Sequence, residues 1–162
     1  MKNSVKLIAL VVGLLASNQM TSRASAQTVR PIRSVQSGFY VRAGVHQDSF
    51  LAAVSPKVTP GGWEELEWIN VGIRNLYVFR SKVSGKFVSV GSDGYLRTNV
   101  TSIVNGPKVD FTTFFWVWPN WEGYFYLQSA GGPWEGKYVT AGPYPLLRAA
   151  ADYPSTWETF GF

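Results

Sequence analysis

The sequence predicts an all-β protein built from three copies of one structural unit. A glycine-led phrase followed by a short apolar phrase recurs in the same order along the chain. The glycine-led copies are GFYVRA at 38–43, GKFVSV at 85–90 and GKYVTA at 136–141, and the apolar copies are FLAA at 50–53, YLRT at 95–98 and LLRA at 146–149. Such a repeat is the signature of a fold built from equivalent units. No sustained apolar period of 3.6 residues accompanies it, so almost no helix is expected.

Each unit is predicted to supply four short strands. The first is an apolar run ending in a polar pair, as at 78–81 and 126–129, with the aromatic and β-branched residues that favour strands. The two repeated phrases supply the next two strands, and the segment GSDG at 91–94 has the composition of a hairpin turn between them. An apolar pair three residues apart marks the fourth strand. Because these pairs follow the threefold pattern, we expect five of their residues to be core: Trp63, Leu66, Phe114, Trp157 and Phe160.

Twelve strands in three pseudo-symmetric units of four predict a β-trefoil, in which six strands form a barrel and three hairpins cap one end. A three-bladed propeller would close poorly, since propellers typically have four to eight blades. The sequence therefore predicts a single β-trefoil domain at 27–162, with repeats at about 31–75, 76–123 and 124–162.

Residues 1–26 have the layout of a secretory signal peptide. Lys2 and Lys6 form a basic start, residues 7–16 are an unbroken apolar run, and residues 24–26 (ASA) resemble a cleavage site. The apolar run is about half of the ~20 residues that a membrane span needs, so stable membrane insertion is not expected. We expect a secreted protein, extracellular or periplasmic in a Gram-negative bacterium, with an uncleaved anchor as the alternative.

The composition of the remaining 136 residues fits one domain without covalent staples. The chain has no cysteine, so packing alone must stabilise it. Three basic residues belong to the leader, which leaves 12 basic and 10 acidic residues and a net charge of +2. The basic residues are scattered singly, so nucleic-acid binding, which needs a cationic footprint, is not expected.

The repeated motifs resemble those of the fascin-like, or actin-crosslinking-like, β-trefoils. The clearest matches are GKYV at 136–139, LLRA at 146–149 and WETF at 157–160, and the resemblance extends from about Pro31 to Phe162. The resemblance implies a trefoil fold, and the best-known members of the family bundle actin inside cells with several trefoils in tandem. One trefoil behind a secretion signal departs from that pattern. At the level of fold the chain is also similar to trefoil lectins and carbohydrate-binding modules, and fold alone does not give function.

Catalytic and metal-binding residues are sparse. The single histidine, His46, lies in a polar segment between two predicted hairpin strands, and there is no nucleophile elbow for a catalytic triad. One histidine and no cysteine exclude the usual zinc sites, and the acids are too dispersed for a calcium loop. Glu64 in the only acidic cluster matches Glu158, so we interpret it as a repeat feature that fixes a loop or strand. We expect no enzyme activity, no cofactor and no metal.

Aromatic residues that break the threefold pattern are the candidate binding residues. Trp121, Trp134 and Tyr144 lie in loops flanked by glycine or proline, where an exposed ring can bind a ligand. The alternative is that they fold back to plug the barrel's open end or to cover hairpins. Asp48 and Asp93 occupy equivalent turns and are either sugar ligands or turn formers. Asn99 begins an N-glycosylation triplet, predicted in a loop, that matters only in a eukaryote.

Carbohydrate binding needs only exposed aromatic rings beside a few fixed polar groups, which this sequence offers. The leading hypothesis is therefore a secreted, non-catalytic protein that binds a glycan or polysaccharide. The alternative is a protein-interaction module, either actin-binding or a secreted inhibitor or effector. A flat patch formed jointly by Trp121, Trp134 and Tyr144 would favour a protein partner. A shallow depression with one aromatic ring and a convergent Asp or Asn would favour a sugar.

Overall fold

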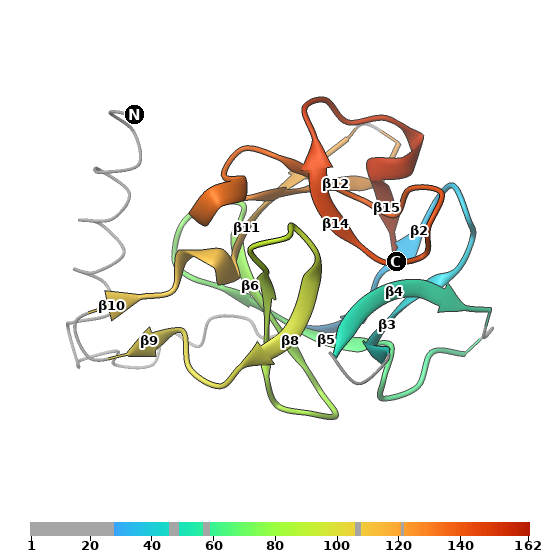
Figure 1. Ribbon diagram of the computed structural model, residues 1–162. Helices are drawn as coiled ribbons and strands as arrows, with labels where there is room; N and C mark the ends of the chain where they lie inside the picture. Colours follow the sequence, from blue (N-terminus) through green and yellow to red (C-terminus); the bar gives the residue numbers. More distant parts are fainter. Residues whose placement is uncertain (1–27, 46–48, 57–58, 106–107, 121) are drawn as a thin grey trace.

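A computed structural model describes residues 28–45, 49–56, 59–105, 108–120 and 122–162 (Figure 1). The strands are β1 (Thr28–Pro31), β2 (Arg33–Ser34), β3 (Tyr40–Val45), β4 (Phe50–Ser55), β5 (Glu65–Asn70), β6 (Leu76–Ser81), β7 (Phe87–Val90), β8 (Leu96–Val100), β9 (Val104–Asn105), β10 (Lys108–Val109), β11 (Phe114–Pro119), β12 (Phe125–Ser129), β13 (Tyr138–Thr140), β14 (Arg148–Ala151) and β15 (Thr159–Gly161).

Helix is confined, in these ranges, to three single turns of 3-10 type. They are η1 (Phe111–Thr113), η2 (Gly132–Trp134) and η3 (Thr156–Glu158). The prediction of an all-β chain with almost no helix is thus confirmed. Within the described part of the chain, no helix is long and apolar enough to cross a membrane.

Antiparallel ladders close the sheet into a ring. In order around it, each strand pairing with the next, the ring contains β2, β15, β12, β11, β6, β7, β8, β4 and β3, and β3 pairs again with β2. Strand β5 pairs with both β6 and β1, and only Ile32 separates β1 from β2. The small β9–β10 hairpin was not anticipated from the sequence.

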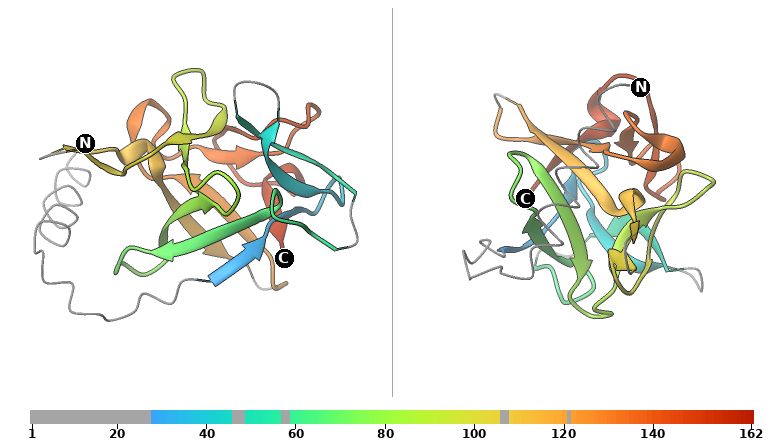
Figure 2. Two further views of the ribbon diagram at one scale, coloured as in Figure 1. Left: turned by 90° about the horizontal axis from the view of Figure 1, so that it is seen from below. Right: turned by 90° about the vertical axis from the view of Figure 1, so that its left-hand side faces the viewer.

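The two ends of the barrel differ in what they expose. The hairpins β3–β4, β7–β8 and β13–β14 gather at one end, whereas β1, β5 and the C-terminus lie towards the other (Figure 2, left). The core between the ends is aliphatic and aromatic. Its largest fully buried side chains include Phe79, Phe114, Phe115, Phe160, Leu51, Leu66, Leu96, Leu127 and Leu147. Because Leu51, Leu96 and Leu147 come from the repeated apolar phrase, that phrase supplies the core beneath the hairpins.

The core predictions from the repeat hold for three residues and fail for one. Leu66, Phe114 and Phe160 are at most 1% exposed, and Trp157 is half-buried. Trp63 is 41% exposed, so its assignment to the core was wrong. Its ring lies on Gly44, where an added Cβ would be 2.6 Å from Cζ3 of the indole. Because Gly44 has no side chain, the indole can pack directly on the backbone of β3 from the solvent side.

The matched glutamates fix loops, as the repeat suggested. Glu64 accepts a hydrogen bond from the amide of Gly61 at 3.0 Å, and Glu158 accepts one from the amide of Ser155 at 2.8 Å. Both carboxylates are buried, and each reaches back three residues along the chain. This is the reciprocal bond of a capping box, and it holds the turn that precedes the last strand of the first and third repeats.

Candidate functional site

The three hairpins contact one another at the same backbone positions. At each junction, a strand amide of one hairpin donates to a carbonyl near the turn of its neighbour. These bonds run from Ala53 to Pro145 (2.8 Å), from Thr98 to Ser49 (2.9 Å) and from Ala149 to Gly94 (2.9 Å). The backbone therefore brings side chains from the three hairpins together in equivalent pairs. We call this end of the barrel the hairpin cap.

The paired side chains differ from junction to junction. The pairs are Phe50 with Arg97, Tyr95 with Arg148, and Leu146 with Ala52. The guanidinium carbon of Arg97 lies 4.3 Å from the centre of the Phe50 ring, and that of Arg148 lies 5.3 Å from the Tyr95 ring. A guanidinium over an aromatic face is an attractive arrangement. Two junctions are therefore closed by an arginine on a ring, and the third only by small or aliphatic side chains.

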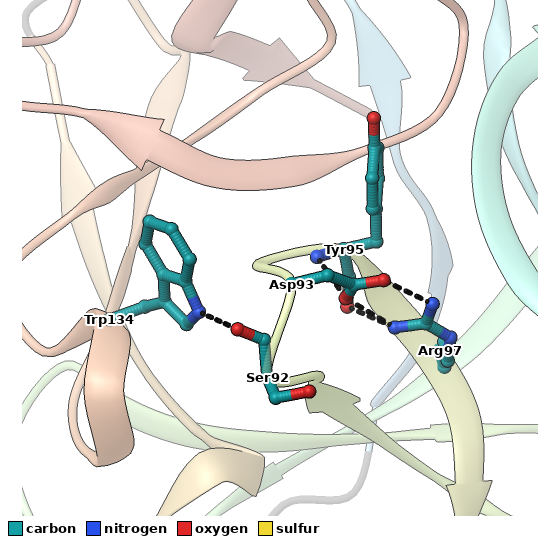
Figure 3. A network of polar contacts seen from close by, with 5 residues as sticks. All are labelled: Ser92, Asp93, Tyr95, Arg97 and Trp134. Atoms are coloured by element: carbon teal, nitrogen blue, oxygen red, sulfur yellow. Dashed lines mark hydrogen bonds and ion pairs between the residues drawn. The ribbon is translucent and has the colours of Figure 1, made fainter.

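Asp93 neutralises one of the two arginines (Figure 3). Its carboxylate accepts bonds from both terminal nitrogens of Arg97, at 2.7 and 2.6 Å, and from the amide of Tyr95 at 3.2 Å. The bond to Arg97 is the main cause that lowers the pKa of Asp93 to about 2, below its ordinary 3.8. Asp93 therefore acts here as a turn former and ion-pair partner, which is one of the two interpretations that the sequence left open.

Trp134 covers the turn of the β7–β8 hairpin. Its indole Nε1 donates to the carbonyl of Ser92 at 3.2 Å (Figure 3). The centre of its ring lies 5.5 Å from the guanidinium carbon of Arg148. Gly94 makes this packing possible, because a Cβ there would lie 3.1 Å from both Trp134 and Arg148. The half-buried ring thus follows the alternative interpretation for this residue, in which the loop folds back over a hairpin.

Arg148 lies between the rings of Tyr95 and Trp134 and keeps its charge unpaired. Its Nε is buried without a hydrogen-bond partner, and no carboxylate among the described residues forms an ion pair with it. Arg97 differs, since Asp93 binds it through two nitrogens. A cation held between two rings in this way can attract an electron-rich ligand group.

A cavity of about 160 Å³ adjoins Arg148 at the third hairpin. Its lining includes Tyr95, Thr140, Pro143, Tyr144, Leu146 and Arg148. Tyr144 is 76% exposed, and the prolines on either side restrict the backbone that carries it. The cavity, which we call the cap cavity, therefore combines a freely accessible ring, a hydroxyl-bearing wall and a cation.

The sequence candidates are only partly brought together. Asp93, Trp134 and Tyr144 all lie at the hairpin cap, but only Tyr144 lines its cavity. Trp121 and Asp48 lie outside the described residues, as does His46. Asn99 lies in strand β8 and not in a loop, so that expectation was wrong. Its side chain is exposed, and its Oδ1 accepts a bond from Ser89 Oγ at 2.7 Å.

Sequence reasoning missed Tyr95 and Arg148 as site residues. The signal was present, because the apolar phrases read YLRT and LLRA and place an arginine at the third position of each. The same phrases also carry the fold, because their leucines are core residues. Across the described residues, no group of three His, Cys, Asp or Glu side chains could hold a metal ion.

Comparison with solved structures places the chain among known folds. It is similar to the BEL β-trefoil, with a TM-score of 0.63 at 13% identity, over 88% of this chain and 96% of that one. It is similar to a ricin B-like lectin of Macrolepiota procera in complex with lactose (TM-score 0.61, 15% identity, 86% and 97% covered). It is also similar to the Rhizoctonia solani agglutinin (TM-score 0.65, 10% identity, 88% and 98% covered).

No protein-family model matches the sequence, and comparison with curated proteins found no match. At identities of 10 to 15% the structural likeness establishes the fold alone. Together with the closed barrel and the three hairpins at one end, it shows that the chain has the β-trefoil fold.

Proposed function

We propose that the protein is a non-catalytic carbohydrate-binding trefoil that is exported through residues 1–26 and binds its glycan at the cap cavity. The observation that carries the proposal is Tyr144, whose ring is 76% exposed at the rim of a cavity that also contains the unpaired Arg148. A sugar ring has a C–H face that packs on an aromatic ring and hydroxyls that accept bonds from a fixed donor. Tyr144 offers the first kind of contact and Arg148 the second.

The neighbouring folds support the same class of ligand. The solved structures similar to this chain include a lectin in complex with lactose and an agglutinin, and both have the same β-trefoil framework. Their binding properties do not transfer through fold alone. The proposal therefore rests on the cap cavity, and the comparisons make a glycan the first ligand to test.

We also infer that the barrel strands and hairpins form three four-stranded units, and the equivalent backbone bonds between hairpins support this. The resemblance to fascin-like trefoils remains a prediction. A broad exposed apolar patch around Tyr144 would support the alternative hypothesis of a protein-interaction module. Trp134 contributes little to such a patch, because it is half-buried against the β7–β8 turn. The cap cavity has one exposed ring, as the sugar hypothesis expects, although its polar partner is an arginine and not Asp or Asn.

The test is a screen of neutral and acidic glycans and polysaccharides on the purified protein and two tyrosine variants. Tyr144→Ala removes the ring at the cavity. Tyr153→Ala is the matched control, because Tyr153 is 84% exposed in the same third of the chain and does not line the cap cavity. A single shallow site should bind at about the millimolar level, near −4 kcal/mol.

We expect Tyr144→Ala to weaken binding about tenfold or more, which corresponds to about 1.4 kcal/mol, and Tyr153→Ala to leave it unchanged. Because Arg148 carries an unpaired charge, an acidic glycan should bind more tightly than its neutral counterpart. Absence of glycan binding by the folded protein, or equal losses in both variants, would reject the proposal. In that case the search would turn to protein partners.

A further inference from the structure

A second, larger cavity of about 430 Å³ lies at the end of the barrel away from the hairpin cap. Strands β1, β5, β6, β11 and β12 all contribute to its lining, together with Phe162. We call it the barrel-mouth cavity. Its volume falls within the range of about 300 to 1,000 Å³ that small-molecule sites occupy. It shares no residue with the cap cavity, so it is a separate candidate site.

Five aromatic side chains contribute to its walls. The ring of Trp68 lies 5.2 Å from that of Phe125, 5.4 Å from Phe162 and 6.0 Å from Tyr77, between ring centres. Trp68 and Phe125 are at most 6% exposed, whereas Phe162 is 51% exposed. The Trp68 Nε1 donates to the carbonyl of Arg30 at 3.3 Å. The polar atom of the indole is thus already bonded, and its remaining surface is apolar.

Three asparagine side chains line the cavity, and the side-chain carbonyls of two of them already bind backbone amides. The Oδ1 of Asn70 accepts from the amide of Gly72 at 2.8 Å, and that of Asn120 accepts from the amide of Tyr124 at 2.9 Å, so both carbonyls serve turns. The side chain of Asn75 forms no such bond to another described residue. A buried polar group left without a partner is unfavourable. Asn75 therefore offers an amide group to the polar end of a ligand.

The side-chain charge at the cavity is positive. Arg30 lines it, and its guanidinium carbon lies 4.8 Å from the centre of the Phe162 ring. No Asp or Glu is among the described residues that line the cavity. An acceptor or anionic substituent on a ligand would therefore meet a cation and an amide rather than a side-chain carboxylate.

We propose that the barrel-mouth cavity binds a small planar aromatic molecule that carries a hydrogen-bond acceptor or anionic group. The aromatic walls pack against the ring of the ligand in the edge-to-face or offset geometry that such rings prefer. Asn75 and Arg30 bind its polar end. This site is independent of the glycan proposal, so either can fail alone.

The experiment uses 8-anilinonaphthalene-1-sulfonate, a fluorescent aromatic anion that brightens when shielded from water. Its binding to the full chain is compared with that of two neighbouring variants in β1. Thr28→Trp places a bulky side chain at the cavity, where Thr28 pairs with Trp68. Val29→Trp makes the same change one residue later, on a 41% exposed side chain that does not line the cavity. Near-ultraviolet circular dichroism checks that each variant is folded, because partly folded proteins also bind this dye.

We expect saturable one-to-one binding, weakened about tenfold or more by Thr28→Trp and less than twofold by Val29→Trp. Phe162→Ala, which removes one wall at an exposed position, should also weaken it. Tyr144→Ala should leave it unchanged, since Tyr144 lines only the cap cavity. Lack of saturable binding, equal effects of the two tryptophan variants, or displacement of the dye by lactose would overturn the proposal.

Discussion

The sequence left two interpretations of Trp134, an exposed binding ring or a cover for a hairpin. Replacing Trp134 by alanine and measuring the free energy of unfolding distinguishes them. In the structure the half-buried indole donates to Ser92 and packs against Arg148. A tryptophan buries about 150 to 250 Å² when covered, so half-burial amounts to about 100 Å². At about 25 cal/mol per Å², that contributes about 2.5 kcal/mol.

The polar contacts of Trp134 add to this estimate. The bond to Ser92 contributes about 1 kcal/mol, and the cation–π contact with Arg148 a similar amount. Because neighbouring contributions are not additive, we expect Trp134→Ala to lower the free energy of unfolding by about 3 kcal/mol. Trp134→Phe keeps a ring on Arg148 and loses the bond to Ser92, so it should cost about 1 kcal/mol.

The assay is equilibrium unfolding in urea, followed by circular dichroism, with Tyr144→Ala as the control. Tyr144 is 76% exposed, so its removal should change stability by less than about 0.5 kcal/mol. The reasoning would be refuted if Trp134→Ala cost less than about 1 kcal/mol, or if Phe and Ala at this position were equally destabilising. The first result would mean that the indole is not anchored, and the second that its bond to Ser92 outweighs its packing.

Two further predictions concern acidic side chains. The pKa of Asp93 is lowered to about 2, so its ion pair with Arg97 stabilises the fold above the ordinary pKa of 3.8, and that stabilisation is lost as pH falls towards 2. Because this pair is partly exposed, we expect a contribution below about 1 kcal/mol, measured as a stability difference from Asp93→Asn that shrinks from pH 5 to pH 2. Glu158→Ala should destabilise by about 1 to 2 kcal/mol in urea unfolding, and Glu158→Gln by less, because the amide oxygen can still accept from Ser155. Equal losses in the two Glu158 variants would contradict a capping role.

The fold was predictable because each repeat mark has a local physical cause. The leucines of the apolar phrases, Leu51, Leu96 and Leu147, are at most 2% exposed, as expected of positions that point inward on, or next to, short strands. The GSDG turn joins β7 and β8, and Gly94 takes a φ of +85° there. Such features depend on the nearest residues in the chain, so sequence alone reveals them.

The site was harder to predict because it depends on contacts between hairpins. Nothing near Arg148 in the sequence indicates that Tyr95, fifty-three residues earlier, lies beneath its guanidinium. The core assignment of Trp63 failed for a similar reason, since the glycine on which its ring lies belongs to strand β3, nineteen residues earlier in the chain. Repeat symmetry predicts the framework, but it does not show which side chains a neighbouring hairpin covers or which of the repeated positions line a cavity.

The asymmetry of the hairpin cap explains why one binding site is expected rather than three. Arg97 on Phe50 and Arg148 on Tyr95 close two junctions, and Asp93 satisfies the first arginine. The third junction pairs Ala52 with Leu146, side chains that fill less space and carry no charge. The cap cavity is lined on one side by Leu146 and on another by the arginine that has no carboxylate partner among the described residues. The framework repeats three times, whereas an exposed ring, an open cavity and an unpaired cation coincide at a single position in the described structure. A protein that bound three ligands equally would need this combination at every junction.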